Sequence, residues 1–358
     1  MGEGFSLVSA IAVIFAFGLL ILVHEFGHFI LARLNGIKVL EFALGFGPRL
    51  IGYKGKETIY TLRLIPLGGF CKLYGMDAEI DENGNQIIAS STDPRSFSNK
   101  KVWQRMSVIA AGPIMNLVLA VVLFMIVYAY FGIATPTDRN VVGSIIEGYP
   151  AQSAGIEPGD RIISVNGIET PTWTDVTQNI HKMPEQEIVL VVEHQGTQRA
   201  ITITPIKDPT TGNGMVGISP EVVYEKTSLL ESARYGFQQT VSFTRLLLVT
   251  IGQMFTGETK AELGGPVAIV QAIDESAESG WENYLAFIGI LSIQLGILNL
   301  FPIPALDGSH LVFLLIEAVR GKPMNPEKVS FIHFLGFVFL MCLMVAVTYQ
   351  DILKLFAK

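Results

Sequence analysis

Long apolar stretches separated by polar regions dominate the hydrophobic pattern of this chain. About 20 apolar residues in a helix cover the hydrocarbon thickness of a bilayer, so each stretch predicts a membrane-spanning helix. The predicted spans are residues 7–32, 106–131, 284–301 and 331–349. The pattern therefore predicts a polytopic α-helical membrane protein with about four spans.

A further apolar-periodic stretch, residues 227–256, differs because charged side chains interrupt it. Arg234 and Arg245 would be costly inside a bilayer. The pattern therefore predicts amphipathic helices that lie on the extracytoplasmic surface of the bilayer, within residues 227–280. The alternative is an additional span through residues 241–255, which would invert the topology of everything that follows.

Composition also indicates an integral membrane protein. Half of the residues are hydrophobic, 16% are charged and the mean hydropathy is +0.45, which is well above that of an ordinary soluble domain. Cys71 and Cys342 lie far apart and outside any C-x-x-C pattern, so neither a disulfide framework nor a cysteine zinc site is expected. The net charge is -7, and no nucleic-acid partner is expected.

The charge distribution predicts the orientation of the spans, because Lys and Arg concentrate in short cytoplasmic loops. Residues 33–105 carry eleven basic and seven acidic groups, and Arg320, Lys322 and Lys328 lie between the last two spans. Residues 133–240 carry seven basic and thirteen acidic groups. The first and last loops are therefore predicted to be cytoplasmic, and the central region and both termini extracytoplasmic. This orientation disfavours the additional span.

The first span contains His24, Glu25 and His28, which form an H-E-x-x-H sequence in apolar surroundings. Ionisable residues are expensive inside a membrane and usually mark a functional site. At about 100° per residue, the two histidines lie one helical turn apart on one face, where both can bind the same metal ion. Zn²⁺ accepts two histidines and an oxygen ligand with a fourth position open for water, and Glu25 is then placed to act as general base. The alternative is a set of buried polar side chains satisfied by helix neighbours.

A second group of candidate residues lies at the end of the third span, in the sequence N-L-F-P-I-P-A-L-D-G. Pro302 and Pro304 cannot both lie in a continuous helix, so the span must break here. Broken backbone at membrane depth is tolerated where it is buried in protein or lines a wet cavity. Asp307 is predicted either to cap the next helix, residues 308–319, or to supply the missing oxygen ligand. His310 is a weaker candidate for that ligand.

The first loop is predicted to contain a β-hairpin on the cytosolic side. Residues 39–47 and 57–64 have β-like composition and are separated by a turn near residues 52–55. Gly68 and Gly69 follow, and glycine permits unusual backbone angles. The hairpin could pair its edge with an unfolded substrate segment by strand addition, which makes these glycines candidate substrate-binding residues. The alternative is a hairpin that only connects the two spans.

The central region contains A-x-x-A-G-I-x-P-G-D-x-I, starting at Ala151, and predicted strands at residues 161–165, 188–193 and 200–205. Over residues 141–206 this pattern resembles a PDZ domain of the bacterial protease type, which is an α+β fold. PDZ domains bind chain ends or extended segments beside an exposed strand. The alternative is a domain that only blocks or shapes access to the membrane region.

Four features occur together: H-E-x-x-H in the first span, G-P-x-x-N ending at Asn116 in the second, the PDZ domain, and N-x-x-P-x-P-x-L-D-G in the third span. Together they resemble the site-2 protease family of intramembrane zinc metalloproteases, in its bacterial regulator-of-sigma-E protease branch. The resemblance implies that His24, His28 and Asp307 bind one zinc ion and that Glu25 is the catalytic base.

The resemblance also implies that Asn299 helps to hold the substrate backbone near the metal, and it makes Asn116 a further candidate for substrate binding. A membrane-reentrant hairpin near residues 39–70 is implied as well. The chain departs from some relatives in having one PDZ domain, whereas they carry two in tandem.

The resulting hypothesis is a metalloendopeptidase of the bacterial cytoplasmic (inner) membrane. The resemblance implies that it hydrolyses transmembrane segments of single-span proteins, such as anti-sigma factors after a first cleavage, or remnant signal peptides. The alternatives are an inactive membrane adapter that gathers partners through its PDZ domain, and a metal transporter. The predicted domains are residues 1–131 (two spans and the hairpin), 132–226 (PDZ domain), 227–280 (interfacial helices) and 281–358 (the last two spans).

Overall fold

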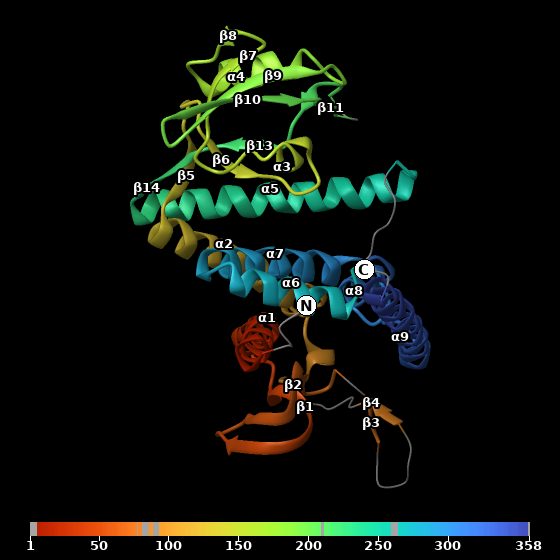
Figure 1. Cartoon of the computed structure of the whole chain (residues 1–358). Coiled ribbons are helices and arrows are strands. Elements are labelled where there is room, and N and C mark those ends of the chain that lie inside the picture. Colours follow the sequence, from red (N-terminus) through yellow and green to blue (C-terminus); the bar gives the residue numbers. More distant parts are fainter. Residues whose placement is uncertain are drawn as a thin grey trace. The chain divides into compact units, whose positions relative to one another are not determined.

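The computed structural model describes residues 6–76, 78–80, 86–88, 93–208, 211–258 and 264–356. The predicted orientation of the two chain ends concerns residues outside this set. The chain divides into two compact units. The first unit combines residues 1–129 with residues 228–358, and the second, Tyr130–Thr227, is inserted between them in the sequence (Figure 1).

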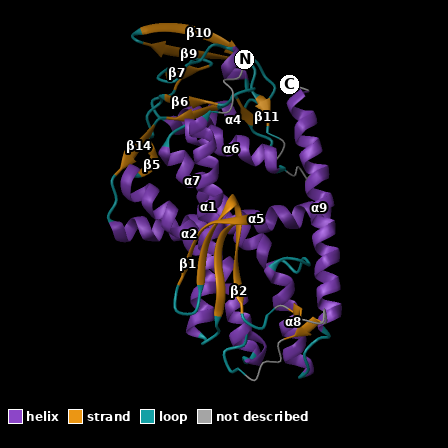
Figure 2. Ribbon diagram, turned by 90° about the horizontal axis from the view of Figure 1, so that it is seen from below, coloured by secondary structure: helices purple, strands orange, loops and turns teal. Residues whose placement is uncertain are grey.

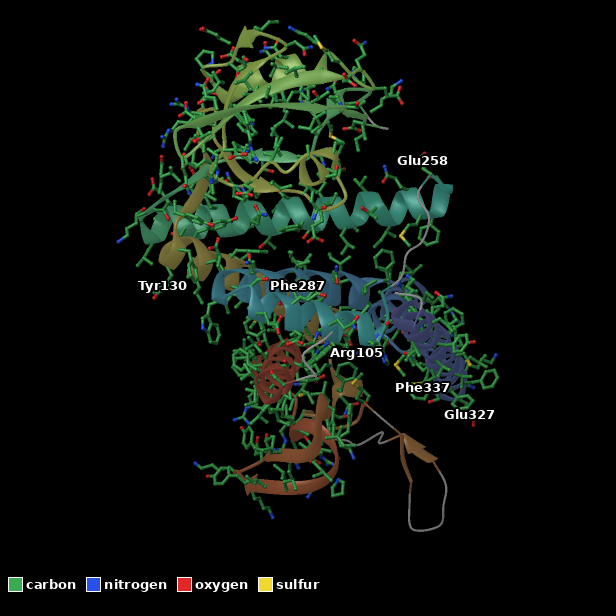
Figure 3. The ribbon with its side chains drawn as sticks, in the orientation of Figure 1. Arg105, Tyr130, Glu258, Phe287, Glu327 and Phe337 are labelled. Atoms are coloured by element: carbon green, nitrogen blue, oxygen red, sulfur yellow. The ribbon has the colours of Figure 1, made fainter. Side chains whose placement is uncertain are left out.

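The first unit contains the four described helices that are long and apolar enough to cross a membrane. They are α1 (Leu7–Leu34), α2 (Val102–Phe131), α7 (Trp281–Leu300) and α9 (Pro326–Phe356). The predicted spans agree with these helices, which extend further because helical backbone continues into the flanking turns. Apolar side chains of α9, among them Phe331, Phe339 and Val345, are exposed, as expected for a helix that faces lipid. Figure 3 draws the side chains of this helix.

Three further helices of this unit are α5 (Leu229–Thr256), α6 (Pro266–Glu278) and α8 (Asp307–Arg320). Residues 241–255 lie in α5, which is not among the candidate spans of the described chain. The interfacial position of α5 and α6 stays a prediction.

Small residues allow the spans of the first unit to approach closely, as is usual for helices that pack in membranes. A Cβ atom at Gly27 of α1 would lie 2.7 Å from the backbone carbon of Ala111 in α2. The hydroxyl of Ser292 in α7 donates a hydrogen bond of 2.7 Å to the backbone oxygen of Asn116 in α2. The buried apolar cluster between α1, α2, α6 and α7 comprises Val13, Ala16, Leu20, Leu119, Leu123, Ile273, Tyr284, Ile288 and Leu291.

The loop between α1 and α2 forms two long antiparallel strands, β1 (Val39–Lys54) and β2 (Ile59–Leu73). Residues 41–44 pair with residues 69–72 on one side and with residues 59–62 on the other. Each strand therefore bends back, and the pairing segments lie side by side (Figure 2). The hairpin presents the last part of β2 as an edge next to α1.

The sequence-based limits of the hairpin were too short, and its turn was misplaced. The turn closes with a hydrogen bond of 2.9 Å from the Gly55 N–H to the Thr58 carbonyl, not at residues 52–55. Gly45 and Gly47 have φ angles of 89° and 85°, which lets β1 bend and continue. Local composition could not reveal this, because the second half of each strand is defined by its pairing with distant residues.

The buried carboxylate of Glu41 fixes this bend. It accepts hydrogen bonds from the Thr61 hydroxyl at 2.7 Å and from the guanidinium groups of Arg63 and Arg49 at 2.7 and 3.0 Å. Burial alone would raise the pKa of the Glu41 carboxyl, but the hydrogen bonds from Arg63 and Thr61 and the charges of both arginines hold that pKa below its usual value. One ionised side chain therefore links three pairing segments.

The second unit is built around a four-stranded sheet with the strand order β10-β9-β7-β8. Its strands are β7 (Arg161–Val165), β8 (Ile168–Glu169), β9 (Ile188–His194) and β10 (Thr197–Ile203). Two helices accompany the sheet, α3 (Pro150–Ser153) and α4 (Trp173–His181). The core is one cluster of twelve buried apolar residues, and the arrangement fits the predicted PDZ domain.

Short antiparallel pairs complete the described chain. In the second unit they are β5 (Ile133–Pro136) with β14 (Val222–Glu225), β6 (Val142–Ile145) with β13 (Ile218–Pro220), and β11 (Ile206–Lys207) with β12 (Gly214–Met215). In the first unit, β3 (Ala78–Ile80) pairs with β4 (Gln86–Ile88), and a 3-10 helix covers Phe97–Asn99.

Replacing Gly27 by valine tests the close crossing of α1 and α2. The added side chain meets the backbone of Ala111, and such overpacking typically costs about 1–3 kcal/mol. We expect Gly27→Val to lower the thermal unfolding temperature of the purified protein in detergent. Gly18→Val is the matched control, because nothing lies within 4 Å of a Cβ atom at Gly18. Equal unfolding temperatures for the two variants would contradict this packing.

Candidate metal centre

Three potential metal ligands from distant parts of the chain converge in the first unit. His24 and His28 lie one turn apart on α1, and Asp307 is the first residue of α8. The two Nε2 atoms are 3.3 Å apart, and Asp307 Oδ2 lies 3.1 Å from His24 Nε2 and 3.4 Å from His28 Nε2. Both imidazoles are buried, so the predicted ligand set meets away from solvent.

The spacing of these three atoms matches the needs of one tetrahedral ion. With metal–ligand distances of about 2.0–2.1 Å, ligand atoms in a tetrahedron are separated by about 3.3 Å. Asp307 Oδ2 is buried and makes no hydrogen bond to any described residue. A buried carboxylate oxygen without a donor is costly, and a cation among the three atoms would remove that cost.

The Nδ1 atoms of both histidines contact groups on α2. His28 Nδ1 lies 2.8 Å from the carbonyl oxygen of Val108, which can only accept, so this nitrogen carries the proton and Nε2 keeps a free lone pair. His24 Nδ1 lies 3.3 Å from Asn116 Nδ2, and Asn116 Oδ1 is buried without a partner. A half-turn of the amide would let Oδ1 accept a hydrogen bond from the His24 Nδ1–H.

Asn116 contacts His24 in this arrangement, and its predicted contact with substrate stays a prediction. Its side chain is fully buried against His24. The motif G-P-x-x-N carried the signal, because residues 112 and 116 lie one turn apart on the same face of α2.

Gly112 is the residue that sequence reasoning did not single out. A Cβ atom there would lie 2.8 Å from His24 Nε2 and closer still to His28 Nε2. Because Gly112 has no side chain, α2 leaves the space in which the two imidazoles face Asp307. The glycine of G-P-x-x-N could have suggested this close approach.

Glu25 lies beside the ligand set and next to the hairpin. The backbone of Cys71 in β2 lies close to its carboxylate. A Cβ atom at Gly69 would lie 3.4 Å from Glu25 Cγ and 3.1 Å from Ile21. The edge of β2 therefore runs along the same side of α1 as the candidate base. Gly68 has a φ of 117°, and any side chain there would meet the Phe46 ring.

The remaining candidates lie elsewhere. Asn299 Nδ2 donates to the Leu295 carbonyl within α7 at 3.0 Å, and the described residues show no hydrogen bond between Asn299 and the ligand set. His310 stacks on His333, with ring centroids 4.1 Å apart, and is not part of the cluster. The helix-cap alternative for Asp307 is wrong, because Leu306 occupies the N-cap position and no side chain caps the helix.

The cluster of His24, His28 and Asp307 is buried among apolar helices and has a glutamate beside it. This arrangement is typical of membrane-embedded metalloproteases. The profile of Peptidase family M50 matches residues 12–343, and the chain belongs to this family. This agrees with the resemblance to site-2 proteases.

Relatives match over nearly the whole chain. A protein of Clostridium acetobutylicum is 40% identical over 348 residues, covering 97% of this chain and 98% of the relative. Regulator of sigma-W protease RasP of Bacillus subtilis is 33% identical over 419 residues, covering 97% and 99%. Among solved structures, the PDZ domain of an SdrC-like protein from Listeria monocytogenes is 19% identical, with a TM-score of 0.21, and covers 25% of this chain and 94% of that domain.

Replacing Gly112 by alanine tests whether the space left at this position is needed for metal binding. The methyl group would displace the Nε2 atoms of His24 and His28, and we expect zinc affinity to fall at least about tenfold. Competition with a chromophoric chelator measures this on the purified protein. Gly252→Ala serves as the control, because nothing lies within 4 Å of a Cβ atom there. Unchanged affinity in Gly112→Ala would show that the ion is bound elsewhere.

Proposed function

We propose that this protein is an intramembrane zinc metalloprotease that hydrolyses peptide bonds in the transmembrane segments of single-span proteins. The observation that carries the proposal is the convergence of His24, His28 and Asp307 beside Glu25. A relative from Bacillus licheniformis named Zinc metalloprotease RasP, 35% identical over 97% of this chain and 99% of its own, supports zinc as the metal.

The residues present fit such an ion, with two imidazole nitrogens and one carboxylate oxygen as its protein ligands. Bound there, Zn²⁺ supplies a Lewis acid that polarises the scissile carbonyl and makes water a better nucleophile at neutral pH. Glu25 takes the proton of the attacking water and passes a proton to the leaving amine. Val108 and Asn116 keep the two imidazoles oriented through their Nδ1 atoms.

The edge of β2 is the proposed place for the substrate backbone. A helix hides its carbonyls in its own hydrogen bonds, so a substrate span must unwind before attack. The backbone of Cys71 lies next to Glu25, and Gly69, two residues earlier in the strand, lies on the same side of α1. An unwound segment could pair along this edge, next to the ligand set.

The second unit is proposed to receive a chain end or an extended segment. It contains a cavity of about 130 Å³ beside α4 and β12, lined by residues that include Tyr149, Ile180, His181 and Met215. A pocket between a helix and a strand suits strand addition with one anchoring side chain. The alternative stays that this unit only shapes access to the membrane region.

The proposed setting follows from charge and from the relatives. We place the protein in the bacterial cytoplasmic membrane, with the hairpin on the cytosolic side and the PDZ domain and both termini outside. The name of the Bacillus subtilis relative supports substrates of the anti-sigma-factor kind, already shortened by a first cleavage. Remnant signal peptides are a second candidate. An inactive adapter would not need this complete ligand set, and a transporter would have no use for Glu25 beside it.

Glu25→Gln separates catalysis from metal binding. The amide cannot accept a proton, so cleavage of a model single-span substrate in detergent should fall at least about a hundredfold. The three ligands are untouched, so the zinc content measured by atomic absorption should stay at one ion per chain. Glu278→Gln, on the exposed surface of α6, is the control. Substantial residual cleavage by Glu25→Gln would refute the assigned role.

Thiol labelling tests the proposed orientation. In a background with both native cysteines replaced by alanine, Thr197→Cys in the PDZ domain should react with an impermeant maleimide on intact cells. Lys56→Cys, in the turn of the hairpin, should react only after the membrane is permeabilised. Both side chains are exposed, so access depends on the side of the membrane. The reverse pattern would invert the topology.

A further inference from the structure

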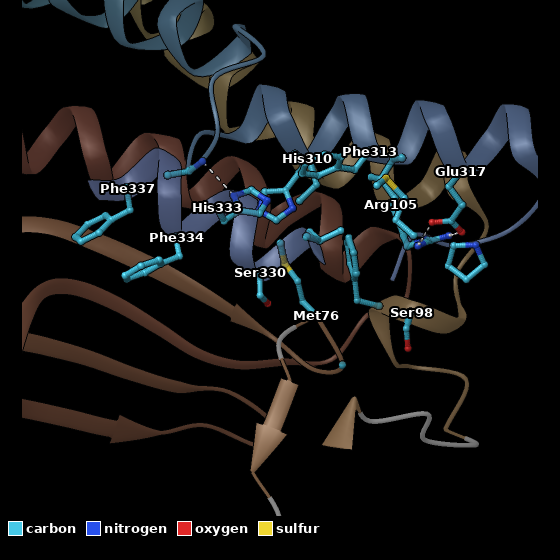
Figure 4. A pocket seen from close by; sticks show the side chains of 18 residues that line it. Met76, Ser98, Arg105, His310, Phe313, Glu317, Ser330, His333, Phe334 and Phe337 are labelled. Carbon is cyan, nitrogen blue, oxygen red and sulfur yellow. Dashed lines mark hydrogen bonds and ion pairs between the residues drawn. The ribbon is translucent and has the colours of Figure 1, made fainter. Parts of the chain in front are cut away.

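A cavity of about 730 Å³ lies beside the metal centre, between α8, α9 and the segment that follows β2 (Figure 4). Its lining includes Ala305, His310, Phe313 and His333. None of these side chains belongs to the His–His–Asp cluster. One interaction in this cavity nevertheless reaches the segment that carries Asp307. The Ala305 N–H donates a hydrogen bond of 3.1 Å to His333 Nδ1.

The segment before Asp307 is a tight turn. The Leu306 N–H donates to the Ile303 carbonyl at 3.1 Å, which makes Pro304 and Ala305 the central residues. Ala305 has a φ of 78°. Proline followed by a residue with positive φ is the pattern of a type II turn, which favours glycine at the second central position. Alanine is strained there, and Asp307 begins α8 two residues later.

The turn leaves the N–H of Ala305 without a partner of its own, and broken backbone between membrane helices needs one. His333 of α9 supplies it. Its ring is held by stacking on His310, with centroids 4.1 Å apart, and by an edge contact with Phe313 at 5.5 Å. Because Nδ1 accepts, neutral His333 carries its proton on Nε2, a buried atom without a hydrogen-bond partner among the described residues.

Helix α9 also touches the turn one residue earlier. A Cβ atom at Gly336 would lie 2.6 Å from the carbonyl carbon of Pro304. Gly336 follows His333 by about one helical turn, so both face the same segment. Helix α9 therefore contacts Pro304 through its backbone and Ala305 through an imidazole.

We propose that His333 is a positioning residue for the metal centre, whose hydrogen bond to the Ala305 N–H holds the strained turn that directs Asp307 toward His24 and His28. This inference rests on the proposed function, in that the three side chains are taken to bind zinc. Through this bond, the position of α9 is coupled to the metal affinity of a site formed by α1 and α8.

Zinc affinity of the full-length protein in detergent, measured by chelator competition, tests the proposal. His333→Phe keeps an aromatic ring on His310 but removes the acceptor, and we expect affinity about tenfold weaker than that of the unaltered protein. His333→Asn lacks the ring, but its amide oxygen can accept from Ala305, and we expect affinity within about twofold of that of the unaltered protein. The absorption bands of Co²⁺ in the same site report whether the ligand geometry changes with affinity.

A second variant tests the strain itself. Glycine adopts a φ of 78° at no steric cost, so Ala305→Gly should restore most of the affinity that His333→Phe loses. Unchanged affinity in His333→Phe would overturn the proposal. If the affinity of His333→Asn is weakened at the same time, the result favours ring packing alone. Failure of Ala305→Gly to restore affinity would also overturn it.

The same experiment distinguishes failure of the proposed function. If the unaltered protein and Asp307→Asn bind zinc equally, the ligand assignment fails, whatever the His333 variants show. If Asp307→Asn loses zinc and His333→Phe does not, the ligand assignment stands and the positioning role fails.

Discussion

Two imidazoles and a carboxylate packed among apolar helices are the constraint on which the rest of this structure depends. Polar groups in such surroundings are costly unless each has a partner, and three electron-rich atoms within 3.4 Å of one another repel unless a cation lies among them. The Nδ1 atoms of both histidines contact groups on α2, and their Nε2 atoms face Asp307. The fold around the site thus brings together three potential ligands in a spacing that fits one ion.

Close helix contacts follow from that constraint. Gly27 lets α2 approach α1 until the Val108 carbonyl and the Asn116 amide reach the histidines. Ser292 ties α7 to the backbone of Asn116, so three helices meet at one residue. Such close packing suits a metalloprotease, because the ligands of a catalytic ion must keep their positions.

Two irregular backbone segments of the described chain adjoin the site. The hairpin strand β2 contacts Glu25 through Cys71, and the turn at Ala305 leads into Asp307. A side chain supports each of them, namely Glu41 within the hairpin and His333 of α9 at the turn. Backbone that leaves the helical pattern can present itself to a substrate or aim a ligand, but it requires such support.

The sequence alone indicated the spans and the residues that meet at the candidate site. Apolar runs long enough for a bilayer defined the four spans, and the spacing of His24 and His28 fixed their common face, because both signals depend on residues a few positions apart. The motif in the second unit likewise indicated its PDZ-like arrangement. What only the tertiary structure decided was how distant segments meet: the doubling back of β1 and β2, the space left by Gly112, the contact of Asn116 with His24 and the support of Ala305 by His333. Helical periodicity says which face of a helix a residue occupies. It does not say which other helix that face meets or how closely the two helices approach, and those contacts set the geometry of the site.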